Sequence, residues 1–358
     1  MKPLLNQKET GLLCVIFVLI CLLSGGCGQR RVIPIEIAVR EEISKPYGRL
    51  VESDYEKVIS LTIRDQSITN IEGIELCRNL ERLGLLQTPI SDLSPLKHSE
   101  KLIELQLYEN NVMDIAPISN LPNLKKLTIT KNPVGNIEPV ADMEKLESLS
   151  LRELSPRLRD ITPIMNLTNL TSLNLQMNDI EDVSPIANLK HLKELFISEN
   201  NVSDIASLSN LQGIERLGIG GNPISDLSPL EELTNLKYLG LNGIRLADLS
   251  LFSFMPDLNN LSITGSNLDD VNSLANYKQI NILKLTDNNI RDISRFSALP
   301  NIRRLDLSGN NIVDLKPLVD NTGIGLGDEI WLLTNPLSDT AINEQIPALK
   351  ARGVTVSY

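Results

Sequence analysis

A repeat of 22 residues is the strongest constraint on the fold of this chain. The segment LTNLTSLNLQMNDIEDVSPIAN (residues 167–188) is followed directly by LKHLKELFISENNVSDIASLSN (residues 189–210), and the two align position by position. A unit this short cannot bury its own hydrophobic face, so neighbouring units must stack and share one core. The repeat therefore predicts one array of stacked turns, although 358 residues would otherwise suggest two or three globular domains.

A pair of apolar residues separated by one other residue recurs in every unit. Alternation over so few residues is typical of a short strand with one buried face, because successive side chains point to opposite faces. Thirteen pairs occur: Leu61/Ile63, Leu83/Leu85, Leu105/Leu107, Leu127/Ile129, Leu149/Leu151, Leu173/Leu175, Leu195/Ile197, Leu217/Ile219, Leu239/Leu241, Leu261/Ile263, Leu283/Leu285, Leu305/Leu307 and Ile330/Leu332. They predict stacked strands whose apolar side chains share a core.

An asparagine lies three residues after the second apolar residue of most pairs. A buried amide at this position can bond the backbone of its own turn and of the next one, where a bend leaves polar groups unpaired. The column consists of Asn110, Asn132, Asn178, Asn200, Asn222, Asn288, Asn310 and Asn335. We therefore expect a ladder of buried amides along the array.

A column of acids lies further along each turn. Its members are Asp92, Asp114, Asp160, Asp182, Asp204, Asp226, Asp248, Asp270, Asp292 and Asp314, with Asn70 and Asn136 as substitutes. Each is a lone carboxylate without the dense ligand spacing of a calcium loop, so we expect no metal site. Such side chains bond backbone N–H groups a residue or two ahead and so form turns. Ser-Pro or Thr-Pro follows several of them, which predicts a short 3₁₀ turn with the hydroxyl as its cap.

The phrase L-x-x-L-x-L-x-x-N-x-I-x-D-I-x-P-L, found in LTNLTSLNLQMNDIEDVSPI, resembles the 22-residue class of leucine-rich repeats. Bacterial internalins and a protein phosphatase regulatory subunit contain this class. About thirteen units cover residues 58–337, nearly four-fifths of the chain. The resemblance implies an α/β leucine-rich repeat solenoid, with a curved parallel β-sheet on the concave side and short 3₁₀ or helical turns on the convex side.

The segments on both sides of the array differ from the repeat. Residues 34–57 place Ile35, Val39 and Ile43 on one face of an expected helix, followed by a second short helix in SDYEKVISL. Residues 338–358 predict a helical turn and a last strand, Val354 to Val356. A solenoid exposes its core at each end, so we expect a helical N-terminal cap and a C-terminal cap.

The first residues are typical of an export signal. Lys2 and Lys8 precede the apolar run GLLCVIFVLICLL, and small residues lead to Cys27. Small residues before a cysteine resemble the lipobox of bacterial lipoproteins, in which the cysteine sulfur receives diacylglycerol and becomes the new N-terminus. We therefore expect residues 1–26 to be a lipoprotein signal peptide, Cys27 the lipidation site, and residues 27–33 a tether. This implies an exported protein, anchored by lipid in the membrane of the bacterial cell envelope or surface.

Two alternatives fit the same segment less well. The lipobox has an aliphatic residue three before the cysteine, where this chain has Ser24, so an ordinary secretory signal is one alternative. The other is an uncleaved membrane anchor, which would need about 20 apolar residues, more than this run contains.

Charge and cysteine content limit the partners. The chain contains 34 Lys and Arg against 45 Asp and Glu, a net charge of −11. Such an acidic body is a poor partner for nucleic acid. Beyond the signal and Cys27, only Cys77 remains, and it occupies a place that is aliphatic in neighbouring units. We therefore expect a small buried hydrophobe and no disulfide.

Residues that flank and divide the apolar pairs point out of the core onto the sheet face. Aromatic residues make up only 3% of the chain, and yet four lie on this face. Between two of them lie several glycines, which predicts two ring walls beside a shallow floor of backbone. Aromatic anchors beside polar groups favour an interface or a sugar site, whereas unselected surface variation is the alternative. The candidate ligand-binding residues are Tyr108, Phe196, Arg216, Gly218, Tyr238, Asn242 and Trp331.

The one unit of 24 residues adds a second irregularity. Its sequence LRELSPRLRDITPI places Arg152, Arg157 and Arg159 around Pro156, which predicts a small basic bulge on an acidic body. Contact with a partner is one interpretation of this bulge. A tolerated insertion in a surface loop is the simpler one.

Catalysis has little support in the sequence. His98 and His191 are the only histidines, and neither belongs to a cysteine or serine motif. The chain also lacks a phosphate-binding glycine loop, a nucleophile elbow and a metalloprotease motif. We expect no catalytic residues and no cofactor. The sequence predicts a monomer that binds a protein or peptide through its concave face; carbohydrate or peptidoglycan binding is the alternative, and a phosphatase-regulating role conflicts with the export signal.

Overall fold

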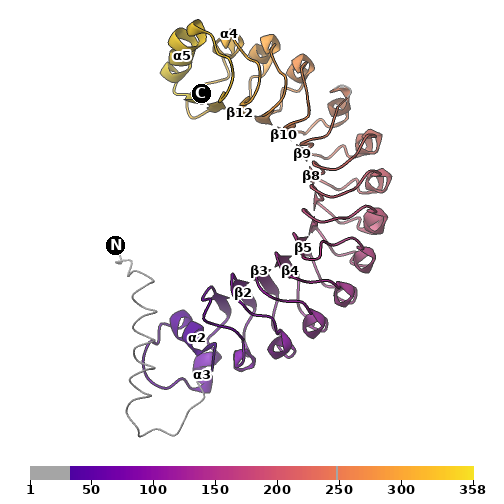
Figure 1. Ribbon diagram of the computed structural model, residues 1–358, viewed down its shortest axis with the longest axis vertical. Coiled ribbons are helices and arrows are strands. Elements are labelled where there is room, and N and C mark those ends of the chain that lie inside the picture. Colours follow the sequence, from indigo (N-terminus) through magenta and orange to yellow (C-terminus); the bar gives the residue numbers. More distant parts are fainter. Residues whose placement is uncertain (1–32, 247–248) are drawn as a thin grey trace.

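A single sheet of parallel strands runs through the whole protein. The computed structural model describes residues 33–246 and 249–358, so Cys27, most of the expected tether and Asp248 lie outside the described residues. Strands β1 to β14 lie in chain order, each beside the next. Figure 1 shows the sheet on the inner side of an arc and the helical turns on its outer side. This confirms the predicted leucine-rich repeat solenoid.

The strands are short and the connections between them are mostly single 3₁₀ turns. The strands are β1 (Ser60–Ile63), β2 (Arg82–Leu86), β3 (Glu104–Tyr108), β4 (Lys126–Thr130), β5 (Ser148–Arg152), β6 (Ser172–Asn174), β7 (Glu194–Phe196), β8 (Arg216–Gly218), β9 (Tyr238–Gly240), β10 (Asn260–Ser262), β11 (Ile282–Lys284), β12 (Arg304–Asp306), β13 (Glu329–Trp331) and β14 (Thr355–Ser357). The 3₁₀ turns are η1 (Ile74–Leu76), η2 (Ser94–Leu96), η3 (Ala116–Ile118), η4 (Glu138–Val140), η5 (Thr162–Ile164), η6 (Ser184–Asn188), η7 (Ala206–Asn210), η8 (Ser228–Glu232), η9 (Ser250–Phe254), η10 (Asn272–Asn276) and η11 (Ser294–Ala298).

The register of the sheet places equivalent leucines side by side. Leu195 lies opposite Leu173 on one neighbour and Leu217 on the other. All three are completely buried, as is almost every residue of the thirteen apolar pairs. Complete burial of one leucine side chain contributes about 1.5–3 kcal/mol, so the stacked leucines supply most of the driving force for folding.

The predicted amide ladder is present, and it points toward the preceding turn. The Asn200 side-chain nitrogen donates to the carbonyl of Ile197 in its own turn at 2.9 Å and to that of Leu175 in the preceding turn at 3.0 Å. Its side-chain oxygen accepts from the Ile180 N–H, also in the preceding turn, at 3.0 Å. The expected bond to the following turn is therefore wrong. The side chain points toward the preceding turn, because the Ile180 N–H and the Leu175 carbonyl of that turn lie within hydrogen-bonding distance of it.

The acids after the ladder form the predicted turns. Asp182 accepts the Ser184 N–H at 2.7 Å and the Ser184 hydroxyl at 2.9 Å. The backbone bond recurs at Asp92, Asp114, Asp160, Asp204, Asp226, Asp270, Asp292 and Asp314. The serine hydroxyl does not cap η6, contrary to expectation, because it donates to the aspartate instead. A carboxylate therefore begins most of the described turns, and the amide oxygens of Asn70 and Asn136 do so in two others.

From residue 33 onward, two short helices precede the first strand. They are α2 (Glu36–Glu42) and α3 (Glu52–Tyr55). Ile35, directly before the first helix, and Val39 within it are completely buried against the end of the repeat core. Arg40 holds the connection between the helices, since it donates to Glu36 at 2.7 Å and to the Gly48 carbonyl at 2.8 Å.

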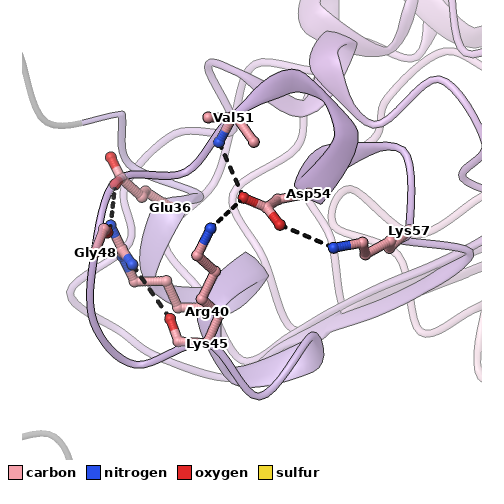
Figure 2. Close-up of polar contacts among 7 residues, drawn as sticks. All are labelled: Glu36, Arg40, Lys45, Gly48, Val51, Asp54 and Lys57. Atoms are coloured by element: carbon pink, nitrogen blue, oxygen red, sulfur yellow. Dashed lines mark hydrogen bonds and ion pairs between the residues drawn. The ribbon is translucent and has the colours of Figure 1, made fainter.

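A buried carboxylate holds the second of these helices (Figure 2). Asp54 accepts from Lys45 Nζ at 2.6 Å, from Lys57 Nζ at 3.0 Å and from the Val51 N–H at 3.0 Å. Its side chain is only 4% exposed. The Lys45 ammonium, the Val51 N–H and the Lys57 ammonium hold the pKa of this carboxyl well below its usual range.

The last turns depart from the repeat. Helix α4 (Lys316–Asp320) replaces the 3₁₀ turn, and a π-helical turn, η12 (Ala341–Gln345), continues into α5 (Ile346–Ala351) before β14. Gln345 joins this segment to the array, because its oxygen accepts from the Leu315 N–H at 2.7 Å. No helix within residues 33–246 and 249–358 has the length and apolar character required to cross a membrane.

Removal of one amide from the ladder should destabilise the array strongly. Asn200→Ala leaves the Ile180 N–H without its acceptor inside the core and removes one of the two asparagine donors of the Leu175 and Ile197 carbonyls. We expect this to lower the free energy of unfolding by about 1–3 kcal/mol. Asn201→Ala is the matched control, because this neighbouring side chain is exposed. Urea unfolding followed by circular dichroism measures both. Equal stability of the two variants would contradict a structural role for the ladder.

The Asp54 contacts predict a specific acid sensitivity. The folded state lowers the pKa of this carboxyl, so its contribution to stability is present above the unfolded pKa of about 3.9 and is lost as the pH falls below that value. We expect Asp54→Asn to melt earlier than the wild type at pH 7 and the difference to shrink near pH 3. Glu41→Gln, an exposed change on α2, is the control. A difference in melting temperature that is independent of pH would contradict the prediction.

Candidate binding face

The outward side chains of the strands form the concave face, on the inner side of the arc (Figure 1). In β3, for example, Leu105 and Leu107 are buried, whereas Glu104, Gln106 and Tyr108 point away from the core. The core is filled by the inward set alone. Outward residues are therefore not needed to fill the interior.

Four outward residues on three consecutive strands form the most organised group on this face, which we call the aromatic–arginine cluster. They are Glu194, Phe196, Arg216 and Tyr238. The centroids of the Phe196 and Tyr238 rings lie 6.2 Å apart, with the ring planes inclined by 56°. The Arg216 guanidinium carbon lies 6.0 Å from the first centroid and 5.2 Å from the second. Its Nε is 3.4 Å from a Glu194 carboxylate oxygen.

The structure thus brings together three of the predicted site residues and adds Glu194, which the sequence did not single out. Arginine over aromatic rings is attracted by the negative ring faces. The ion pair and the two ring contacts restrain the guanidinium from several sides. The cluster therefore presents a preorganised surface rather than three mobile side chains.

Two glycines determine how the rings lie. Gly218 is beside Phe196 in the sheet, and a Cβ at Gly218 would be 2.9 Å from Cδ1 of that ring. A Cβ at Gly240 would be 3.0 Å from the Tyr238 hydroxyl oxygen. Both rings therefore lie down over the space that a side chain would fill, and both glycines are buried. The expected open floor between two ring walls is wrong, because the rings cover it.

Asn242 extends the polar edge of the cluster. It follows β9 and is exposed. Its side-chain oxygen accepts from the Ser262 hydroxyl at 2.8 Å and from the Thr264 N–H at 3.0 Å. These bonds hold the Asn242 amide against β10, the neighbour of the strand β9 that carries Tyr238.

Tyr108 and Trp331 lie elsewhere on the face. Tyr108 is on β3, four strands before Phe196, with Lys131 Nζ 5.9 Å from its ring centroid. Trp331 is on β13, four strands after Tyr238. Because adjacent strands are about 4.8 Å apart, each is roughly 19 Å from the cluster. They share the surface with the cluster but not its contacts.

The arginines of the 24-residue unit are divided between two surfaces. Arg157 and Arg159 line a shallow groove at the turn, where Arg159 Nε is 4.0 Å from Asp179. Arg152 is an outward residue at the end of β5, and its Nη2 is 3.0 Å from the Met177 sulfur. The predicted basic bulge therefore contains only two arginines, because the strand carries the third onto the concave face.

Comparison with known proteins agrees with this geometry. The model of the family described as leucine-rich repeats (two copies) matches residues 168–210 and 190–232. No curated protein sequence matches the chain. The solved structure of an internalin from Listeria monocytogenes superposes with a TM-score of 0.75, covering 90% of this chain and 94% of the internalin at 26% identity. The chain is an internalin-like leucine-rich repeat protein.

This internalin-like protein shares its fold with more distant proteins. A leucine-rich repeat protein of Leptospira interrogans has a TM-score of 0.62 and 20% identity, over 83% of this chain and 81% of its own. The ectodomain of the plant receptor kinase GASSHO1/SCHENGEN3 from Arabidopsis thaliana, solved in complex with CASPARIAN STRIP INTEGRITY FACTOR 2, has a TM-score of 0.56 and 16% identity, over 79% of this chain and 38% of its own. At these identities the similarity concerns the fold alone.

The internalin-like array also contains a second column of amides that the sequence analysis did not identify. Each side chain donates to a backbone carbonyl of the preceding turn, on the flank where the chain enters the strand. The column consists of Asn79, Asn123, Asn169, Asn235 and Asn301. An asparagine directly before a leucine or isoleucine, as in RNL, PNL, TNL and PNI, was the available signal. His191 occupies the equivalent place, with Nδ1 2.9 Å from the Thr168 carbonyl, which gives it a structural role.

Other residues of the internalin-like protein that could carry chemistry are dispersed. Within residues 33–246 and 249–358, no three His, Cys, Asp or Glu side chains are arranged to hold a metal ion. Cys77 is buried, and burial raises the pKa of its thiol to about 12. This thiol is therefore protonated at neutral pH and behaves as part of the core.

Proposed function

We propose that this protein is a non-catalytic, lipid-anchored component of the bacterial cell envelope that binds a protein or peptide through the aromatic–arginine cluster. The observation that carries the proposal is the outward position of Phe196, Arg216 and Tyr238 on a core that is complete without them. The leucines between them in the same strands are completely buried and fill the interior. Folding therefore gives no reason for two large rings on this surface.

The chemistry of the cluster suits a protein interface. Aromatic rings offer a large contact area and lose little conformational entropy on binding, and arginine provides several fixed donors. The Arg216 side chain is 51% exposed although it is paired with Glu194, so a ligand can still reach the guanidinium. Rings that already lie over Gly218 and Gly240 need little reorganisation.

The comparisons support a protein partner in general terms. Internalin-like repeats form the fold, and the plant receptor ectodomain of the same fold was solved in complex with another molecule, CASPARIAN STRIP INTEGRITY FACTOR 2. The anchoring part of the proposal depends on the sequence alone, since Cys27 and the apolar run before it match a lipoprotein signal.

Loss of both rings should abolish most of the affinity. A partner is first identified by crosslinking on whole cells and mass spectrometry, and its affinity is then measured by surface plasmon resonance. We expect Phe196→Ala combined with Tyr238→Ala to weaken binding about 100-fold or more, as for central aromatic anchors. Tyr108→Ala removes an outward ring four strands away and serves as the control. Unchanged affinity in the double variant would place the site elsewhere. A glycan array with the same variants tests the carbohydrate alternative.

The lipid anchor is tested with labelled palmitate in growing cells. We expect a labelled wild-type band in the membrane fraction, and we expect Cys27→Ser to lose the label because the acceptor sulfur is absent. Cys77→Ser is the control that should keep it, since that thiol is buried in the repeat core. An unlabelled wild-type band would remove the anchor without affecting the proposed binding face.

A further inference from the structure

The middle of the concave face has the opposite charge to the protein as a whole. The chain carries a net charge of −11. Between β4 and β11, however, the outward positions of the strands hold four basic residues and one acidic residue. The basic residues are Lys126, Arg152, Arg216 and Lys284, and the acidic residue is Glu194. A positive strip therefore lies along the inside of an acidic arc.

Most of this positive charge has no partner within the described chain. Glu194 is already paired with Arg216 at 3.4 Å. Among residues 33–246 and 249–358, no carboxylate lies within ion-pairing distance of Lys126, Arg152 or Lys284. Lys126 and Lys284 are exposed. Their charges are therefore available to a ligand.

Arg152 adds an independent observation. Its Nε–H is buried without an acceptor in the described chain, although Nη2 contacts the Met177 sulfur. A buried donor without a partner costs free energy, and a carboxylate at this end of β5 that turns the guanidinium toward itself would recover that cost. Between Arg152 and the cluster, strand β6 presents the neutral residues Ser172 and Asn174, and the one carboxylate nearby, that of Glu194, accepts from the Ser172 hydroxyl at 3.1 Å and pairs with Arg216.

The spacing of these charges matches an extended peptide. Lys126 is on β4 and Arg152 on β5, before the aromatic–arginine cluster on β7 to β9, and Lys284 is on β11 beyond it. Seven strand intervals at about 4.8 Å correspond to roughly 34 Å. An extended chain covers about 3.4 Å per residue, so a segment of about ten residues spans the strip.

We propose that the concave face binds an extended acidic segment of a partner protein, with carboxylates at Lys126, Arg152 and Lys284 and an apolar side chain on the rings of the cluster. This inference rests on the proposed function and specifies its ligand. The acidic turns repel such a segment from the convex side, while the positive strip attracts it. Electrostatic complementarity of this kind determines orientation and association rate.

Peptide probes of matched design test the charge requirement. Three fluorescein-labelled peptides of about twelve residues contain the same two phenylalanines and are otherwise built from Glu and Ser, Gln and Ser, or Lys and Ser. Binding to the full chain in a neutral detergent is followed by fluorescence anisotropy. We expect the acidic peptide to bind about tenfold or more tightly than the basic one, with an affinity that falls as salt is added.

Charge reversal on the protein gives the second arm. Lys126→Glu with Lys284→Glu should remove the preference for the acidic peptide, and both positions are exposed, so the fold should tolerate them. Lys97→Glu with Arg291→Glu changes the net charge equally on exposed turns and should keep the preference. Melting temperatures verify that all variants are folded.

The outcomes separate this inference from the proposed function. Equal binding of the three peptides, or no binding of any of them, overturns the proposal that the ligand is an acidic segment. If binding is independent of peptide charge but is lost in the Phe196→Ala and Tyr238→Ala double variant, the cluster is still the site and only the charge of the ligand was wrong. The partner found by whole-cell crosslinking decides the proposed function separately.

Discussion

The stacking of each turn on the preceding one is the interaction on which the rest of the structure depends. No turn has an interior of its own, so Leu195 is buried only because Leu173 and Leu217 lie on either side of it. The amide of Asn200 reinforces the same contact by bonding the backbone of the preceding turn. Cohesion between nearest neighbours leaves the first and last turns with one open side. The Asp54 network and Gln345 act at these two ends, where the repeat itself cannot supply a partner.

Stacking also explains why a binding surface can exist on this fold without a pocket. The inward side chains fill the core and the register is fixed by the repeat, so the outward side chains form columns separated by one strand spacing. Residues 22 positions apart in the sequence become neighbours, as Phe196 and Gly218 do. A change of one outward residue therefore alters the surface without altering the fold. On the proposed binding face, this separation leaves the aromatic–arginine cluster free to match a ligand while the framework stays regular.

Features that follow the period could be predicted from the sequence, and features that depend on side-chain conformation could not. The apolar pairs, the Asn200 column and the Asp182 turns each repeat, so a correct interpretation of one unit predicts the same feature in the other units. The position of the Phe196 ring depends on a missing Cβ in the neighbouring strand, which alternation alone does not reveal. The Asp54 network lies in a segment without a repeat and depends on the packing of two short helices. The sequence indicated the outward face and three residues of the cluster but not Glu194. A single acid on a strand has no distinctive pattern, and only the structure shows that it pairs with Arg216.

The net charge of the chain is itself a consequence of the turns. Each convex turn needs an acceptor for a backbone N–H, and an aspartate supplies it with a bond such as that from Thr162 to Asp160. Hydrogen bonds from the Thr162 side chain and from its backbone N–H lower the pKa of the Asp160 carboxyl, so this group stays charged at neutral pH. The turns therefore require about one negative charge in most repeats, whereas the strands require none, and acids such as Glu194 occur there singly. Because this contribution is structural, the charge of the whole molecule says little about its ligand. For the proposed binding face, the sign that matters is that of the sheet, where Lys126 and Lys284 are exposed outward residues.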